Sequence, residues 1–187
     1  MKLRNIFLYL TAFLMLTTTI VFSQIETATY TAGNIPTTYI ESTSVTTSST
    51  ATDPGTLTIT IPTGNTTITS VDVAYQMTAH ITAYMAEQRS FIKCVSTGGT
   101  TEAEVYSGVG NAEGTYSYNR TNIDIANSVT NGGDIEFELH AFRTFFDDGS
   151  NTTHQYVNNN SWSVTVNYTP PHQIQPVLFK QLKEQAK

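Results

Sequence analysis

Strict alternation of apolar and hydroxyl side chains is the feature that most constrains how this chain can fold. Residues 56–61 read Thr-Leu-Thr-Ile-Thr-Ile, with turn-forming Pro-Gly before them at 54–55 and Pro-Thr-Gly-Asn after them at 62–65. Successive side chains of a strand point to opposite faces of a sheet. The segment therefore predicts a β-strand that buries Leu57 and Ile59 and exposes its threonines.

Similar period-two segments recur along the chain, separated by turns rich in Gly, Asn and Asp. The expected strands span 38–46, 56–61, 68–77 with a bulge at Ser70, 89–95, 102–106, 114–125, 134–145 and 162–168. About eight such strands predict an all-β fold, an antiparallel β-sandwich of jelly-roll type. An immunoglobulin-like sandwich is the alternative, although the Cys…Trp…Cys spacing that would support it is absent.

The amino-terminal segment has the pattern of an export signal. Lys2 and Arg4 precede a short apolar run at 6–22, and small residues end it before Gln24. A membrane-spanning helix needs about 20 apolar residues, whereas this run is shorter and contains several threonines. We expect a cleaved leader, a mature chain from Gln24 without a membrane span, and a location that is secreted, on the cell surface or periplasmic.

These patterns divide the chain into four segments. Residues 1–23 are the leader, and 24–36 form a lead-in that is either an edge strand or a loose extension. Residues 37–169 form the sandwich domain. A Gln- and Lys-rich tail at 170–187 begins with Pro170 and Pro171, and the sixteen residues after them are marginal as a free helix.

Composition argues against nucleic acid and anionic membranes as partners, and it leaves the fold without an internal disulfide. Without the two leader cations the mature chain carries seven basic and 15 acidic residues, a net charge of −8. Such a chain offers no basic stripe for nucleic acid or an anionic membrane surface. Cys94 is the only cysteine, so no internal disulfide can form, and its place beside Ile92 in the alternation predicts a buried thiol.

An acidic strand is the sharpest chemical feature. Residues 134–140 read Asp-Ile-Glu-Phe-Glu-Leu-His, which places Glu136, Glu138 and His140 on one face. The segment faintly resembles the acidic strand of laminarinase-type glycoside hydrolases, where two carboxylates about 5–5.5 Å apart perform retaining hydrolysis. The order of acidic residues differs from that motif. We favour a solvated strand face whose carboxylates pair with Arg89 and Lys93 across strands.

Two further groups are candidates for binding. Asp147, Asp148 and Asn151 offer oxygen ligands for a structural Ca²⁺, although a plain hairpin or longer turn is the stronger interpretation, and no other cofactor is expected. Aromatic and hydrogen-bonding residues that could hold a sugar, together with Glu136, Glu138 and His140, are Tyr116, Tyr118, Arg143 and Trp162.

Three stretches carry a family resemblance. They are Met85-Ala-Glu-Gln-Arg-Ser-Phe-Ile-Lys-Cys, the run from Gly108 to Thr121, and Asp134-Ile-Glu-Phe-Glu-Leu-His-Ala-Phe-Arg-Thr. Together they resemble an uncharacterised β-sandwich domain of secreted or surface proteins from bacteria with type IX secretion, over residues 35–169. The resemblance implies a surface location and no assigned activity. The tail does not resemble a sorting domain, which implies either a periplasmic end point or a short member.

The sequence thus predicts an exported binding or adhesion module that recognises glycans or other cell-surface components and has no catalytic activity. Two alternatives stay open. One is a small glycan-active hydrolase that uses Glu136 and Glu138, and the other is a structural or self-assembling surface protein. The sequence does not indicate an oligomeric state.

Overall fold

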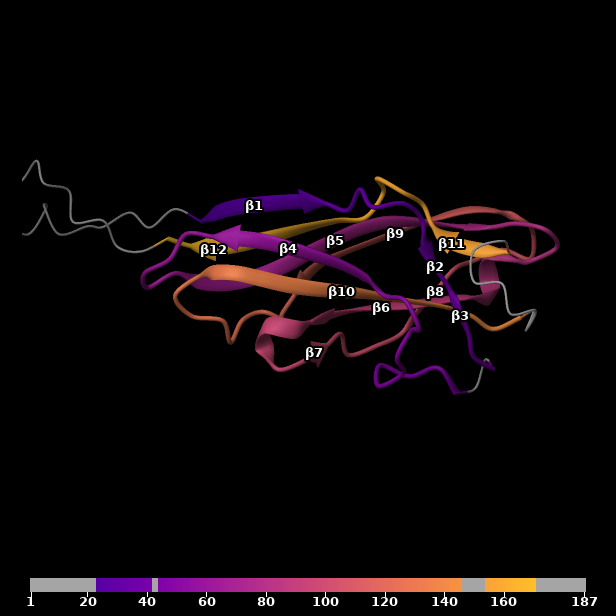
Figure 1. The fold of residues 1–187 in the computed structure, drawn as a ribbon, viewed down its shortest axis with the longest axis horizontal. Helices are drawn as coiled ribbons and strands as arrows, with labels where there is room; N and C mark the ends of the chain where they lie inside the picture. Colours follow the sequence, from indigo (N-terminus) through magenta and orange to yellow (C-terminus); the bar gives the residue numbers. More distant parts are fainter. Residues whose placement is uncertain (1–22, 42–43, 146–153, 171–187) are drawn as a thin grey trace, which may run out of the picture.

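The computed structural model describes residues 23–41, 44–145 and 154–170, which form two β-sheets packed face to face (Figure 1). The predicted leader, the candidate calcium ligands Asp147, Asp148 and Asn151, and the tail beyond Pro170 lie outside these residues. Within them, no helix has the length and apolar character needed to cross a membrane.

The first sheet is built around one long strand. Its members are β1 (Gln24–Thr29), β2 (Ile35–Pro36), β5 (Thr67–Ala79), β9 (Gly114–Ile123), β11 (Gln155–Val157) and β12 (Ser163–Thr169). One edge of β5 pairs with β9, and the other pairs first with β12 and then with β11. β1 and β2 pair in turn with β12 and β11. β1–β2 and β11–β12 therefore act as two interrupted strands.

The second sheet is centred on β10. Its members are β3 (Thr38–Tyr39), β4 (Gly55–Ile61), β6 (Gln88–Cys94), β7 (Thr100–Thr101), β8 (Tyr106–Ser107) and β10 (Gly133–Arg143). β4 and β3 share one edge of β10, β6 occupies the other, and β7 and β8 pair with the far edge of β6. Short 3₁₀ turns, η2 (Met85–Glu87) and η3 (Val95–Thr97), flank β6.

This connectivity is that of a jelly roll. If β1 is merged with β2, β7 with β8 and β11 with β12, and β3 is set aside, eight described strands remain. When these eight are numbered in chain order, their order is 1-8-3-6 in the first sheet and 2-7-4-5 in the second. Every pairing is antiparallel except the two-residue contact between β3 and β10. The predicted antiparallel sandwich of jelly-roll type is therefore confirmed.

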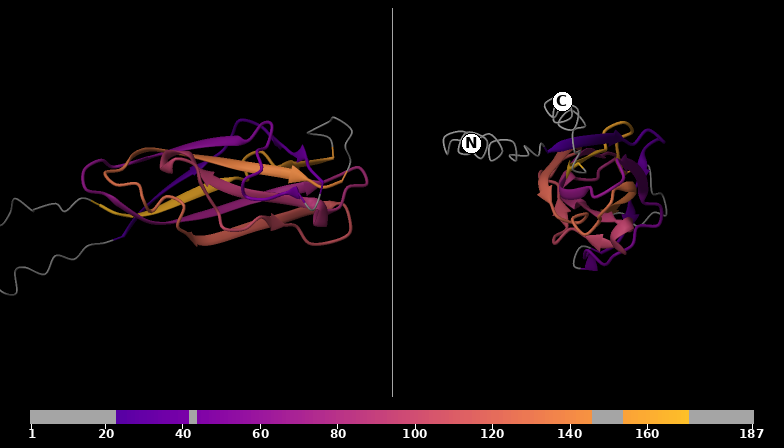
Figure 2. Two further views of the ribbon diagram at one scale, coloured as in Figure 1. Left: turned by 90° about the horizontal axis from the view of Figure 1, so that it is seen from below. Right: turned by 90° about the vertical axis from the view of Figure 1, so that its left-hand side faces the viewer.

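The two sheets face each other (Figure 2), and the alternating apolar residues form the core between them. In β4, Leu57, Ile59 and Ile61 are buried and the intervening threonines are exposed, as the pattern predicts. Burial of each large apolar side chain contributes about 1.5–3 kcal/mol. Cys94 is fully buried in this core, which raises the pKa of its thiol and confirms its predicted place.

The bulge predicted at Ser70 is also present. Asn167 pairs with Ser70 while Tyr168 pairs with Ile68, so Thr69 is the extra residue of β5. An inserted residue shifts the side-chain alternation by one position. Ile68 and Val71 consequently both face the core.

One open alternative is decided, and one predicted boundary is wrong. Of the two interpretations of 24–36, the edge strand holds, because β1 and β2 pair with β12 and β11. Among the described residues of 38–46, the expected strand is confined to β3. Beyond it, Ser and Thr side chains bond nearby backbone, as in the donation from the Thr46 amide to Ser49 Oγ, and these bonds compete with sheet pairing.

The strand expected over 102–106 is also absent. β7 and β8 flank an irregular segment in which the Glu102 carboxylate, rather than a backbone carbonyl, accepts the Ile92 amide at 2.7 Å. The Glu102 amide still donates to the Ile92 carbonyl. The Glu102 side chain thus takes the place of one backbone hydrogen bond along the edge of β6.

We predict that Trp162→Phe leaves stability unchanged or raises it slightly. The ring is fully buried against Tyr30, with centroids 5.7 Å apart, but its Nε1 makes no hydrogen bond within the described residues. Phe keeps most of the packing and removes a buried donor that lacks a partner. Trp162→Ala should instead cost about 3–5 kcal/mol because it leaves a cavity. Thermal unfolding of both variants checks this, and equal losses would contradict it.

Candidate functional site

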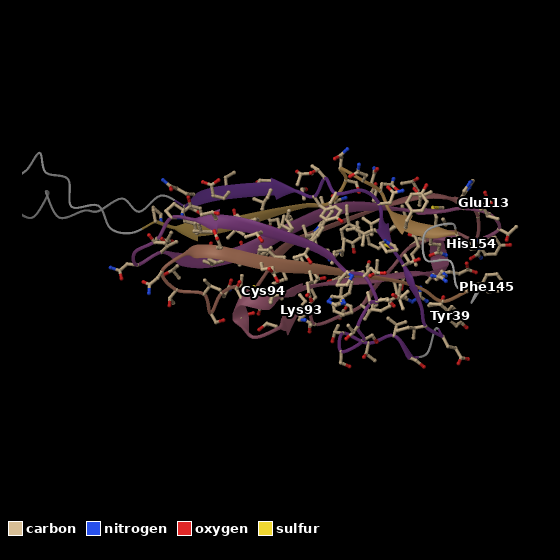
Figure 3. The ribbon with its side chains drawn as sticks, viewed as in Figure 1. Tyr39, Lys93, Cys94, Glu113, Phe145 and His154 are labelled. Atoms are coloured by element: carbon tan, nitrogen blue, oxygen red, sulfur yellow. The ribbon has the colours of Figure 1, made fainter. Side chains whose placement is uncertain are left out.

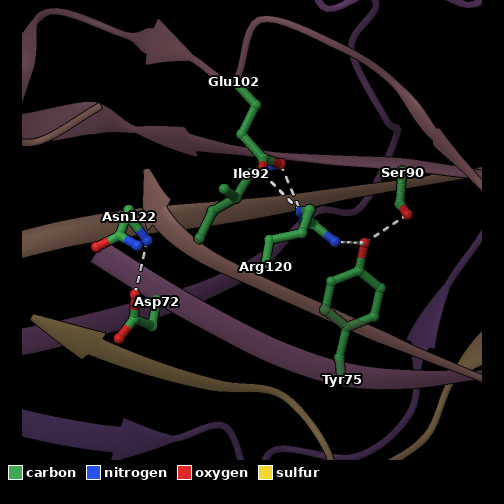
Figure 4. A network of polar contacts seen from close by, with 7 residues as sticks. All are labelled: Asp72, Tyr75, Ser90, Ile92, Glu102, Arg120 and Asn122. Atoms are coloured by element: carbon green, nitrogen blue, oxygen red, sulfur yellow. Dashed lines mark hydrogen bonds and ion pairs between the residues drawn. The ribbon is translucent and has the colours of Figure 1, made fainter. Parts of the chain in front are cut away.

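A buried ion pair joins the two sheets near the middle of the sandwich (Figure 4). The Arg120 guanidinium of β9 donates from Nε to Glu102 Oε1 at 2.6 Å and from Nη2 to Oε2 at 2.9 Å. Its Nη1 donates to the Tyr75 hydroxyl at 3.0 Å, and that hydroxyl also hydrogen bonds Ser90. Arg120 and Tyr75 come from one sheet, whereas Ser90 and Glu102 come from the other or its flanking loop.

Aromatic rings surround this ion pair. Arg120 lies 4.3 Å from the ring centroid of Tyr106 and 5.1 Å from that of Tyr75, within the range of cation–π attraction. Tyr118 stacks on Tyr75 at 4.8 Å and donates its hydroxyl hydrogen to Gln88 Oε1. Burial opposes the charge on Arg120, but Tyr75 and Glu102 outweigh it and raise the pKa of the guanidinium.

Arg120 faces inward by the regular alternation of β9, and a bulge follows it. Val73 pairs with Arg120 while Val71 pairs with Ile123, so two residues of β9 lie opposite Asp72. Asn122 occupies this bulge at φ 58° and donates its amide to Asp72 Oδ1 at 2.8 Å (Figure 4). Sequence reasoning missed Arg120 and Glu102 as partners. The alternation of Tyr116, Tyr118 and position 120 was the available signal for Arg120, and nothing local indicated Glu102.

The acidic strand is paired rather than open. Glu138 Oε2 accepts from Lys93 Nζ at 2.9 Å, which confirms the predicted cross-strand pair, and lies 3.0 Å from His140 Nε2. His140 is buried beneath the loop before β4, because its Nδ1 accepts the Ala51 amide at 3.2 Å and its ring stacks on Phe91. That acceptance leaves the proton of the neutral imidazole on Nε2, facing Glu138.

This environment sets the charge of both groups. Burial opposes ionisation of Glu138, but the hydrogen bonds from Lys93 and His140 prevail and lower its pKa. Burial likewise lowers the pKa of His140, partly offset by Glu138. A general acid for glycoside cleavage needs a carboxyl whose pKa is raised, so the direction at Glu138 does not favour the hydrolase reading of Glu136 and Glu138.

The structure does not bring the predicted sugar-binding residues onto one face. Tyr116 and Tyr118 belong to β9 of one sheet, whereas Glu136, Glu138, His140 and Arg143 belong to β10 of the other. Four of the seven are buried, namely Tyr118, His140, Arg143 and Trp162. Arg143 faces the core at the end of β10 and donates to the Thr37 carbonyl. The predicted shared ligand face is therefore wrong, because strand alternation turned most of these side chains inward or under a loop.

A shallow trough that sequence reasoning missed crosses the outer face of the first sheet. Its larger part has a volume of about 430 Å³ and its smaller part about 140 Å³, and both include Ala74 and Asn119. Ala74, which has a small side chain, lies between the walls of the trough. The other residues lining the larger part are Tyr75, Gln76, Ser117, Asn158, Asn159, Asn160 and Ser161, and Asp72, Val73, Arg120, Thr121, Ser163 and Thr165 line the smaller part.

The turn between β11 and β12 forms one wall of the trough. Asn158 Oδ1 accepts from Thr78 Oγ1 at 2.7 Å, and Asn159 Oδ1 accepts the Gly33 amide at 3.1 Å. Asn160 has φ 59°, a conformation that asparagine tolerates in turns. The side chains of Asn119 and Asn160 make no hydrogen bond to other residues that the structure describes. Both amides are therefore available to a ligand.

Charges near the trough are already engaged. The Asp72 carboxylate accepts from the Asn122 amide and from Asn167 Nδ2. The Arg120 guanidinium lies beneath the sheet with Glu102. Tyr75 contributes backbone, since its ring is buried in the core. Hydroxyl and amide groups are thus what the trough presents to a ligand.

The end of the sandwich away from Gln24 carries a strained turn. Ile81 and Thr82 both have positive φ, 53° and 66°, which is uncommon for β-branched residues. Glu113 holds this turn by accepting the Thr82 amide at 2.6 Å, and His154 Nδ1 lies 3.2 Å from the Ile81 carbonyl. Figure 3 labels Glu113 and His154 at this end. Among residues with described positions, no three His, Cys, Asp or Glu side chains form a metal-binding group.

Comparisons with known proteins find only distant likeness. No protein-family model and no curated protein matches the chain. Among solved structures, the chain is similar to a VP2 subviral particle of infectious bursal disease virus, with TM-score 0.35, 16% identity, and coverage of 78% of this chain and 32% of that one. A T13 particle of the same virus gives TM-score 0.34, 12% identity, and coverage of 81% and 36%. The chain spans about a third of the length of these proteins, and a likeness this weak carries no argument.

We predict that Arg120→Met destabilises the protein by about 3–5 kcal/mol, since it leaves the buried Glu102 carboxylate without its partner. Adding Glu102→Gln should recover part of this loss, because neither charge then remains buried and unpaired. Lys93→Met is the matched control. Its pair with Glu138 is partly exposed and should cost only about 0–1 kcal/mol. Denaturant unfolding of the wild-type chain, of Arg120→Met and Glu102→Gln alone, and of the double variant measures the coupling, and strictly additive losses would contradict it.

The lowered pKa of His140 predicts loss of stability in mild acid. Because its folded pKa lies below the ordinary 6.5, the unfolded chain binds the proton first, so stability falls as pH drops below 6.5. Glu138, also lowered, adds a further loss below 4.5. His140→Gln keeps a hydrogen-bond donor and an acceptor but does not titrate. The melting temperature of this variant should therefore fall less between pH 7 and pH 5 than that of the unmodified chain. His80→Gln, at a histidine with an exposed side chain, is the matched control for the substitution itself.

Proposed function

We propose that this protein is an exported, non-catalytic binding module that recognises an uncharged glycan in the trough on the outer face of the first sheet. The observation that carries the proposal is the trough itself. It combines a volume of about 430 Å³ with walls of amide and hydroxyl groups, and it continues into a second hollow of about 140 Å³.

The chemistry of the lining favours sugars over other ligands. Glycans present hydroxyls that both donate and accept, and an asparagine side chain can donate and accept at once. Asn119 and Asn160 carry such groups at the surface. The engaged Asp72 and buried Arg120 leave no free charge to select an ionic ligand. Jelly-roll domains include lectins, which supports the proposal by fold analogy alone.

The same geometry predicts weak binding at each site. Among the described residues that line the trough, none offers an aromatic ring to stack on a sugar, because Tyr75 contributes only backbone there. Hydrogen bonds exchanged with water contribute only about 0.5–1.5 kcal/mol each. Adhesion would therefore depend on several copies acting together, as expected for a module displayed at a cell surface.

We predict that Asn119→Ala weakens binding to neutral polysaccharides by about 3- to 10-fold, the loss of one ligand hydrogen bond. Asn127→Ala, at an exposed asparagine in the turn before β10, is the matched control and should change nothing. Affinity electrophoresis in gels that contain neutral or acidic polysaccharides measures both. Retardation by acidic polymers alone, or equal effects of the two substitutions, would refute the trough as the site.

A further inference from the structure

The first strand is held to the sandwich by backbone pairing and by two side-chain hydrogen bonds to β12, Tyr168 to Gln24 and Thr27 with Thr165. Five of the six residues of β1 are exposed, and Ile25 remains 63% exposed despite its apolar side chain. All six residues pair with β12 in register, from Gln24 opposite Tyr168 to Thr29 opposite Ser163. The attachment therefore consists of contacts that any identical strand could reproduce.

The core is nearly complete without this strand. The first fully buried apolar residue of the sandwich is Ile35, which lies after β1. From 24–30, only Ala28 and Tyr30 pack against the core, and both are partly buried. Departure of β1 would thus remove little apolar burial, but it would leave the backbone groups of β12 without partners. An unpaired edge of this kind accepts another extended strand.

A short exposed segment joins β1 to the rest of the chain. Thr31 and Ala32 are exposed, and Gly33 has φ 112°, a conformation natural to glycine. The sandwich holds the chain again from Gly33 onward, where the Gly33 amide donates to Asn159 and the Asn159 amide donates to Asn34. Residues 31–32 can therefore act as a hinge while β2 stays in place.

We propose that β1 exchanges between copies of this chain, so that β1 of one copy pairs with β12 of another. The occupant is a second copy because its β1 brings the sequence that already matches β12, including the Thr27–Thr165 hydroxyl contact at 2.8 Å. Reciprocal exchange gives a dimer, and one-way exchange gives a linear chain of copies. This assembly is independent of the glycan trough, so either proposal can fail alone.

The test places one cysteine on each partner strand in separate chains. Thr27→Cys and Thr165→Cys occupy positions directly opposite each other, and the native Cys94 is fully buried and does not compete. The two chains, each without the leader and with tags of different mass, are mixed at high concentration under mild oxidation. Strand exchange predicts a disulfide-linked heterodimer. A mixture of Thr27→Cys with Ser117→Cys, on the outer face of β9, should give only background linkage.

A single chain that carries both Thr27→Cys and Thr165→Cys shows whether the geometry permits the disulfide. If this chain closes internally while the mixture of single variants yields no more heterodimer than the Ser117→Cys control, the proposal is overturned. Sedimentation of the unmodified chain gives a second readout that needs no cysteine. Its dimer fraction should rise with concentration and disappear in the internally locked chain, and a strictly monomeric unmodified chain would also overturn exchange.

Discussion

The buried pair of Arg120 and Glu102 is the interaction on which the arrangement of this jelly roll most depends. A carboxylate and a guanidinium taken out of water are costly unless each finds its full set of partners. Here the carboxylate accepts from Arg120 and from the Ile92 amide, and the guanidinium also donates to Tyr75. Any displacement of one sheet against the other would leave a buried charge unpaired, so the pair favours one relative position of the sheets.

That constraint also shapes the exposed face. The alternation of β9 turns Arg120 inward, and the bulge at Asn122 that follows ties β9 to Asp72 of β5. Outward positions of the same strand, Ser117 and Asn119, then line the trough beside the small Ala74. The inner ion pair and the outer binding surface are two sides of one strand. A change in the pairing register of β9 would therefore move both together.

Much of the fold was open to prediction because strand signals are local. Alternation identified β4, β5, β6, β9, β10 and β12 to within about two residues, and the chain order of these strands is consistent with a jelly roll. Prediction failed where a side chain replaced backbone pairing, as at Glu102, or where hydroxyls bonded the nearby backbone, as at Thr46. It left β1 open between an edge strand and a loose extension, because its pairing partner lies at the other end of the chain.

At the candidate site, too, local features were predictable from the sequence and long-range contacts were not. The sequence by itself determined which residues share a strand face and the burial of Cys94, since these follow from alternation along a strand. It predicted Lys93 as a partner of the acidic strand, and the register of β6 on β10 selected Glu138. Only the tertiary structure decided that a loop covers His140, that Arg120 meets Glu102, and that an asparagine-rich turn walls a trough over Ala74. These contacts join segments distant in sequence, and they exist only once two sheets and their connecting loops have been placed against one another.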